Sequence, residues 1–155
     1  MSSTPASMTR IFHLDAPCAQ VFPLFTPLGE RAWAAGWDPQ MLSGEVVRGS
    51  TFRTRRDDGT TTTWIVSEYD PGAGKISYAR LAGGSNMGLV DVRCIAAEGA
   101  AKRSTVSVTY TLTATSPEGE QFVREFLSDG HYDAMIAEWQ SAISAALAGP
   151  SALQG

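Results

Sequence analysis

The reactive residue types in this 155-residue chain point to one kind of chemistry. The sequence contains no GxSxG motif, no phosphate-binding glycine loop and no evident nucleophile–base pair. Among enzymatic mechanisms, these residue types leave general acid–base catalysis by a carboxylate and a phenol in a desolvated pocket. In that mechanism Asp133 would be the base, Tyr110 the proton donor or oxyanion partner, and Arg80 the cation that stabilises an enolate.

Cysteine and histidine residues are few and scattered. Cys18, Cys94, His13 and His131 show no CxxC pair and no spacing typical of metal ligands. We therefore expect no metal and no cofactor, so that any reaction would be cofactor-independent. Two lone cysteines also indicate a reducing compartment.

Aromatic side chains form a second set of candidates, suited to binding rather than to reaction. Alternation along the strands expected at residues 61–69 and 75–81 places Trp64, Tyr78 and Arg80 on the apolar, inward-facing side. The expected ligand-binding residues are Phe25, Trp33, Trp37, Trp64, Tyr78, Phe126 and Gln140.

An inward-facing arginine requires an anionic partner, because an unpaired buried charge is costly. For Arg80 the candidates are Asp133, Asp91, Glu68 and an anionic group on a ligand. A register slip or a bulge would reverse the direction of these strand side chains.

The stretch GERAWAAGWDP at residues 29–39 leaves two interpretations open. Trp33 and Trp37 either pack a short helix against the sheet or line the mouth of a cavity and stack on a flat ligand. Glu30 and Arg31 are adjacent and cannot face the same way on a helix. Either one is solvated while the other pairs with the sheet edge, or one of them closes the entrance and contacts a ligand carboxyl or carbonyl.

The elements that must position these residues follow from periodicity and turn signals. A strand is expected at TRIFHL, followed by two short helices, the second at about residues 27–34 with Thr26 as N-cap and Gly36 at its end. Turn-forming residues then separate six runs that should pair as an antiparallel meander. The runs are GEVVR, TFRTR, TTTWIVSEY, KISYARL, MGLVDVRCIA and STVSVTYTLTA.

A single long helix is expected after the last strand, starting at Ser116-Pro117 and stopped by Gly149-Pro150. Its apolar stripe contains Phe122, Phe126, Ile136, Ala137, Ile143, Ser144 and Leu147. Asp133 and Gln140 fall inside the apolar arc, so each either bonds to a neighbouring strand or loop, or faces a solvated or ligand-filled cavity. Gly130 is a candidate bend.

The composition of the chain limits the partners and the cellular location that we expect. The net charge of −4 and the pI of about 5.1 argue against a nucleic-acid partner. The N-terminus lacks the apolar segment of a secretory signal, and no stretch approaches the length of a membrane span, so we expect a cytoplasmic protein that does not bind membranes. We expect a disordered lead-in at residues 1–7, one domain at 8–149 and a tail at 150–155, with a homodimer compatible with the exposed strand edges or the convex face.

The order of strand, two short helices, meander and long helix resembles the START/Bet v 1-like (SRPBCC) superfamily and its helix-grip fold. The motifs LDAPCAQVFPLFTPLGERAWAAGWDP, TTTWIVSEYDP and STVSVTYTLTATSPEGEQF are similar to a bacterial branch grouped with polyketide cyclase/dehydrase and lipid-transport-like domains. The resemblance covers about residues 9–148. It implies an α+β fold in which a curved, seven-stranded antiparallel sheet wraps around a long C-terminal helix, and it assigns no catalytic residue.

Three functions are compatible with that resemblance. The first is binding of a hydrophobic or aromatic small molecule in a cavity between the sheet and the C-terminal helix. The second is a polyketide cyclase/dehydratase-like lyase or isomerase that performs an aldol cyclisation or a dehydration. The third is a protein-interaction module related to co-chaperone domains. Two convergent ionisable groups inside the cavity would favour the enzyme, and a large exposed apolar patch would favour the interaction module.

Overall fold

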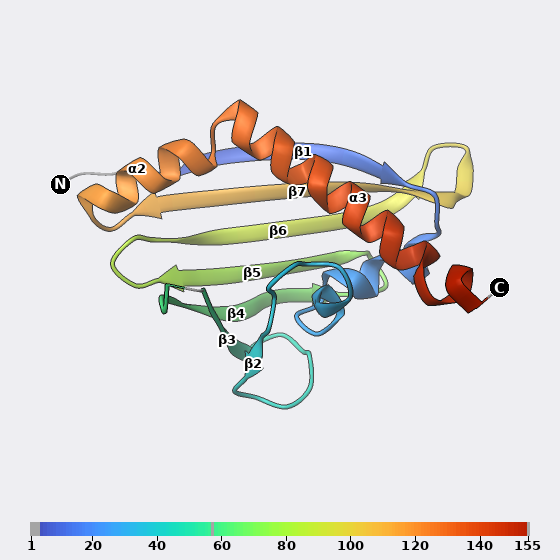
Figure 1. Cartoon of the computed structure of the whole chain (residues 1–155), viewed down its shortest axis with the longest axis horizontal. Coiled ribbons are helices and arrows are strands. Elements are labelled where there is room, and N and C mark those ends of the chain that lie inside the picture. The colour runs from blue at the N-terminus through green and yellow to red at the C-terminus, as the bar shows by residue number, and fades with distance from the viewer. Residues whose placement is uncertain (1–3, 57, 155) are drawn as a thin grey trace.

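A curved antiparallel sheet of seven strands forms most of the molecule in the computed structural model, which describes residues 4–56 and 58–154 (Figure 1). The order across the sheet is β1-β7-β6-β5-β4-β3-β2, and all neighbours are antiparallel, as the meander predicts. The strands are β1 (Ala6–Leu14), β2 (Gln40–Met41), β3 (Thr51–Arg55), β4 (Thr61–Asp70), β5 (Lys75–Ala82), β6 (Asn86–Ala97) and β7 (Ala100–Ala114).

Helices occupy one face and one end of this sheet. In Figure 1 the long helix α3 crosses the sheet, and the short helices lie toward the end of the sheet that its C-terminal half approaches. The predicted helix-grip architecture is therefore confirmed. The helical segments are α1 (Cys18–Val21), the 3₁₀ turns η1 (Phe22–Phe25) and η2 (Gly29–Ala32), α2 (Pro117–Phe126) and α3 (Asp129–Gln154).

Alternation in β7 shows how sequence places one sheet face in the core. Val106, Val108, Tyr110 and Leu112 are all buried. The threonines between them lie on the other face, where Thr109 and Thr111 bond to the hydroxyl groups of β1 side chains. One apolar and one polar face are what an antiparallel sheet covered on a single side requires.

The predicted single C-terminal helix is wrong, because the chain forms two helices that meet at Leu127 and Ser128. The Ser128 hydroxyl accepts a hydrogen bond from the His131 amide, and the Tyr132 amide donates to the Ser128 carbonyl. Ser128 followed by Asp129 is a helix start signal of its own, with a cap and an acid in the first turn. The break lies there and not at Gly130.

The predicted strand GEVVR at residues 44–48 is also wrong, since this segment is a loop and the edge strand β2 lies earlier in the chain. The hydroxyl of Ser50 donates to the Glu45 carbonyl and accepts from the Val47 amide at 2.9 Å. Side-chain bonds of this kind compete with strand pairing and hold the backbone in a turn.

The chain ends differ from the expected boundaries. Within the predicted lead-in, Ala6 and Ser7 already pair with β7, and residues 1–3 lie outside the described residues. At the other end α3 continues through Gly149 and Pro150, so the predicted helix stop at these residues is wrong. Of the predicted tail, residue 155 lies outside the described residues.

Strands β6 and β7 approach one another closely at Gly88. A Cβ added to Gly88 would lie 1.9 Å from the Thr111 carbonyl oxygen. Gly88 pairs with Arg80 on one side and Leu112 on the other, so any displacement of its backbone is transmitted to the inner face of the sheet.

We predict that Gly88→Ala lowers the free energy of unfolding by about 1–3 kcal/mol, the usual cost of forcing extra volume into a packed site. Gly83→Ala is the control, because a Cβ there would meet nothing within 4 Å. Urea unfolding followed by circular dichroism measures both variants. Equal stabilities would show that the close approach at Gly88 is not needed.

Candidate ligand-binding cavity

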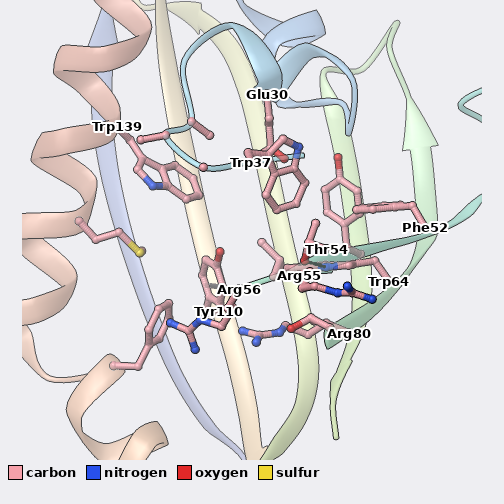
Figure 2. A pocket seen from close by; sticks show the side chains of 18 of the residues that line it. Glu30, Trp37, Phe52, Thr54, Arg55, Arg56, Trp64, Arg80, Tyr110 and Trp139 are labelled. Atoms are coloured by element: carbon pink, nitrogen blue, oxygen red, sulfur yellow. Dashed lines mark hydrogen bonds between the residues drawn. The ribbon is translucent and has the colours of Figure 1, made fainter. Parts of the chain in front are cut away.

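A cavity of about 450 Å³ lies between the concave face of the sheet and the helices. Strands β3 to β7 form its floor, the segment from Glu30 to Trp37 covers one side, and Phe122, Phe126, Met135 and Trp139 approach from α2 and α3 (Figure 2). This volume falls in the usual range for small-molecule sites, about 300–1,000 Å³.

Aromatic rings form much of the wall. Trp37 lies edge-on to both Phe52 and Trp64, with ring centroids 6.0 and 5.7 Å apart, and Phe52 stacks on Trp64. The indole N–H groups are already bonded within the protein: Trp37 donates to the Pro27 carbonyl and Trp64 to the Thr54 hydroxyl. These two tryptophans therefore present ring surface to the cavity and no free donor.

The two interpretations of Trp33 and Trp37 both describe part of their role. Trp33 packs against Phe25 and against Trp139, with centroids 5.9 and 5.2 Å apart, and its indole donates to the Leu24 carbonyl. Both tryptophans nevertheless line the cavity. They join the short helical segment to the core with one edge and contribute cavity wall with the other.

The inward direction predicted for Trp64, Tyr78 and Arg80 is the direction that the structure shows, since all three line the cavity. A bulge does interrupt the pairing of β4 with β5, between Val66 and Glu68. It lies beyond Trp64, so Trp64 and Val66 keep their inward direction. After the bulge Glu68 turns out to solvent and Tyr69 turns in, where it stacks on Phe22. Glu68 is thereby excluded as a partner of Arg80.

Arg80 has no anionic partner among the described residues. Its Nε atom is buried without a hydrogen-bond acceptor, and its guanidinium lies 5.2 Å from the ring centroid of Trp64. Burial lowers the pKa of Arg80. Asp91, another predicted partner, accepts a hydrogen bond from Ser77.

Glu30 contributes a carboxyl group to the opposite side of the cavity (Figure 2). No described residue forms a hydrogen bond or an ion pair with this carboxyl, and desolvation raises its pKa well above the usual value of 4.5. A carboxyl with a raised pKa can hold a proton near neutral pH and exchange it with a bound molecule. Arg31, its neighbour, instead lies on the surface, 3.7 Å from Asp38, and this pairing favours the cavity role for Glu30.

The tyrosine hydroxyls in the cavity differ in availability. Tyr78 donates its hydroxyl to the Phe25 carbonyl, so it ties β5 to η1 and is occupied. Tyr110 has a pKa raised to about 12, chiefly by desolvation, and its hydroxyl has no partner among the described residues. Tyr110 therefore remains protonated at neutral pH and is free to donate to a ligand.

Asp133 does not face the cavity, contrary to the prediction. Its carboxylate accepts from the Arg10 guanidinium at 2.6 Å, and its side chain is 59% exposed. Asp129 binds the same guanidinium, at 2.7 Å. The break at Ser128 changes the rotation of the following helix, so the arc calculated for one continuous helix does not apply to α3.

Gln140 and Phe25 also lie outside the cavity lining. The Gln140 amide donates to the His13 carbonyl of β1 at 2.9 Å, which is the strand contact that the sequence left open as an alternative. Phe25 is fully buried in the core behind Trp33. The predicted residues that the structure brings together are Tyr110, Arg80, Trp33, Trp37, Trp64, Tyr78 and Phe126.

Sequence reasoning missed Met135 and Trp139 as wall residues of α3, together with Arg55 and Arg56 near the cavity. The N-cap signal at Ser128 could have corrected the helix prediction. A second helix started at Ser128 has its own angular phase, and Met135 and Trp139 then lie on its inward face. In the described part of the chain, no group of three histidine, cysteine or acidic residues is placed to hold a metal ion. Over the same residues, no helix is both long and apolar enough to cross a membrane.

Comparison with known proteins agrees with this architecture. Residues 5–149 match the family model described as polyketide cyclase/dehydrase and lipid transport. No curated protein matches the sequence significantly.

Three solved structures illustrate the structural similarity. Truncated norcoclaurine synthase from Thalictrum flavum aligns with a TM-score of 0.69 at 11% identity, over 95% of this chain and 96% of its own. The Zhui aromatase/cyclase from a Streptomyces species has a TM-score of 0.69 at 14% identity, with 94% and 95% covered. A putative uncharacterised protein from Rhizobium leguminosarum has a TM-score of 0.65 at 18% identity, with 92% and 96% covered. At these identities the likeness shows the fold.

We predict that Glu30→Gln changes how stability depends on pH. Because the folded-state pKa of Glu30 lies above its unfolded value, the protonated carboxyl contributes stability at low pH that is lost as pH rises through the folded-state pKa. As pH rises above the unfolded-state pKa of a glutamate, the wild type should therefore lose stability relative to Glu30→Gln. Thermal unfolding from acidic to alkaline pH measures the difference, and parallel curves would contradict a raised pKa.

Proposed function

The chain belongs to the polyketide cyclase/dehydrase and lipid-transport family, and from this premise we propose that it binds a hydrophobic, aromatic small molecule in its internal cavity. The observation that carries the proposal is a cavity of about 450 Å³ walled by Trp33, Trp37, Trp64 and Trp139. Satisfied indole N–H groups on the first three make these walls apolar, so a flat, largely apolar ligand fits them best.

The related structures support an aromatic ligand. One of the norcoclaurine synthase structures, with a TM-score of 0.68 at 11% identity, contains dopamine and hydroxybenzaldehyde. Both are single aromatic rings with polar substituents. In this chain the aromatic wall together with Glu30, Tyr110 and Arg80 could take a ligand of the same general character.

We propose that the protein acts in the cytoplasm and without nucleic acid. Support comes from the acidic net charge of −4 and from the two lone cysteines, Cys18 and Cys94, which are typical of a reducing compartment. Homodimerisation also remains a proposal. Leu81 and Met87 form a directly opposed exposed pair on the sheet, beside exposed Leu89, and could contribute apolar area to such a contact.

Native mass spectrometry of the protein purified from its host tests binding directly. A co-purified small molecule would establish a ligand and its chemical class. A protein that is empty as purified, and that binds no aromatic compound in titrations followed by tryptophan fluorescence, would contradict the proposal.

A cavity-filling substitution provides a matched test. We predict that Met135→Trp abolishes ligand binding, because Met135 lines the cavity and a larger ring would occupy its volume. Ala134→Trp is the control, since Ala134 is the preceding residue of α3 and is exposed. Equal binding by the two variants in tryptophan-quenching titrations would place the ligand elsewhere.

Cyclase/dehydratase-like catalysis is a second candidate function, because three ionisable side chains converge on the one cavity. The raised pKa of Glu30 suits a base that removes a proton from carbon between two carbonyl groups. Arg80 and the Tyr110 hydroxyl could stabilise the resulting enolate. Attack of that carbanion on a ketone forms a carbon–carbon bond, the new alkoxide takes the proton from Glu30, and loss of water would complete a dehydration. In this reaction Glu30 replaces the predicted Asp133.

We predict that Glu30→Gln lowers turnover of a poly-β-ketone thioester by about 10²-fold or more, the usual contribution of a general base. Asp133→Asn should retain turnover, because Asp133 binds Arg10 on the surface. Product formation is followed by mass spectrometry. If the wild type is inactive, or if Glu30→Gln is as active as the wild type, this second function is excluded for that substrate class.

A further inference from the structure

Positively charged side chains predominate among the described residues that line the cavity. Arg55, Arg56 and Arg80 line it, and Glu30 is the one acid in this described lining. Figure 2 shows the three arginines grouped at one end, with Glu30 at the other and aromatic rings between them. The charged groups therefore divide the cavity into a cationic end and a carboxyl end.

Arg80 is the member of this group that is built into the cavity. It comes from the middle of the sheet, on β5, and its Nε atom is buried without an acceptor among the described residues. Gly88 lies opposite it on β6 and Trp64 on β4. Neither neighbour offers an acceptor side chain, because glycine has no side chain and the Trp64 indole N–H is a donor only.

The electrostatic situation of Arg80 is unfavourable without a ligand. The buried Nε–H of Arg80 has lost hydration without gaining an acceptor, and this loss costs free energy. Desolvation lowers the pKa of Arg80, Tyr110 opposes this shift, and repulsion from Arg56 adds to it. The face of Trp64 compensates only in part, since cation–π contacts contribute about 0.5–2 kcal/mol.

We propose that the ligand is an aromatic acid whose oxyanion binds to the guanidinium of Arg80 while its ring system packs against Trp64 and Trp37. The planar guanidinium fork matches a carboxylate. The free hydroxyl of Tyr110 is a further donor on the same wall. This inference rests on the proposed binding function and adds the chemical class of the ligand.

Calorimetric titration with two matched probes, naphthoate and its neutral amide naphthamide, tests the proposal. The wild type should bind naphthoate at least about tenfold more tightly than naphthamide, as expected for one hydrogen bond to a charged group. Arg80→Gln should remove this preference and leave the affinity for naphthamide unchanged. Arg80→Lys keeps the positive charge but loses the planar guanidinium, so it should retain part of the preference for naphthoate over naphthamide.

Arg93→Gln is the control, because Arg93 is exposed on the outer face of β6 and the change in net charge is the same. Thermal unfolding without ligand separates binding from packing: Arg80→Gln should be at least as stable as the wild type, since an unpaired buried charge is removed. A loss of stability would instead indicate a structural role for Arg80 and would count against the proposal.

Two outcomes distinguish a failure of this inference from a failure of the proposed binding function on which it rests. If naphthamide binds the wild type as tightly as naphthoate does, the oxyanion assignment is overturned while aromatic binding stands. If neither compound binds, the proposed binding function fails and the inference fails with it. The comparison of the two probes on the wild type needs no variant, so it decides the question even if Arg80→Gln does not fold.

Discussion

The arrangement of the cavity depends on how α3 is rotated against the sheet, and Tyr132 sets that rotation. Tyr132 is fully buried, and its hydroxyl donates to the Val108 carbonyl of β7 at 2.9 Å. A phenol can be buried in this way only where its ring is packed and its hydroxyl meets an acceptor. Three and seven residues further along the helix, Met135 and Trp139 then face the cavity, whereas Asp133 faces Arg10 at the edge of the sheet.

The cavity keeps polar groups that a core chosen for stability alone would exclude. Glu30 and Arg80 are both desolvated, and neither has a bonded partner among the described residues. Each costs free energy in the unliganded protein, and the two do not form an ion pair with one another. Departures from good packing of this kind are expected where a site is kept for a ligand. The charges inside the cavity are thus the strongest indication of what it binds.

Strand residues were predictable because their periodicity is short and local. Trp64, Tyr78, Arg80 and Tyr110 line the cavity as alternation predicts, and the bulge in β4 comes too late to disturb them. Helix residues were less predictable, since a phase error accumulates along a long helix. The prediction of one helix over residues 117–148 kept the same angular phase beyond Ser128, where the chain in fact starts a new helix. Asp133 and Gln140 were therefore placed toward an interior that they do not reach.

Local patterns in the sequence were sufficient to determine the antiparallel meander and the buried face of its strands, because alternation and turn chemistry act over a few residues. They could not determine which polar side chains lack a partner. That depends on contacts between distant segments, such as Arg10 with Asp133 across the α3–β1 contact. Only the tertiary structure left Glu30 and Arg80 without a partner among the described residues of one cavity, because the acids that the sequence offered to Arg80 are bonded elsewhere, as Asp133 and Asp91 are, or turned to solvent, as Glu68 is.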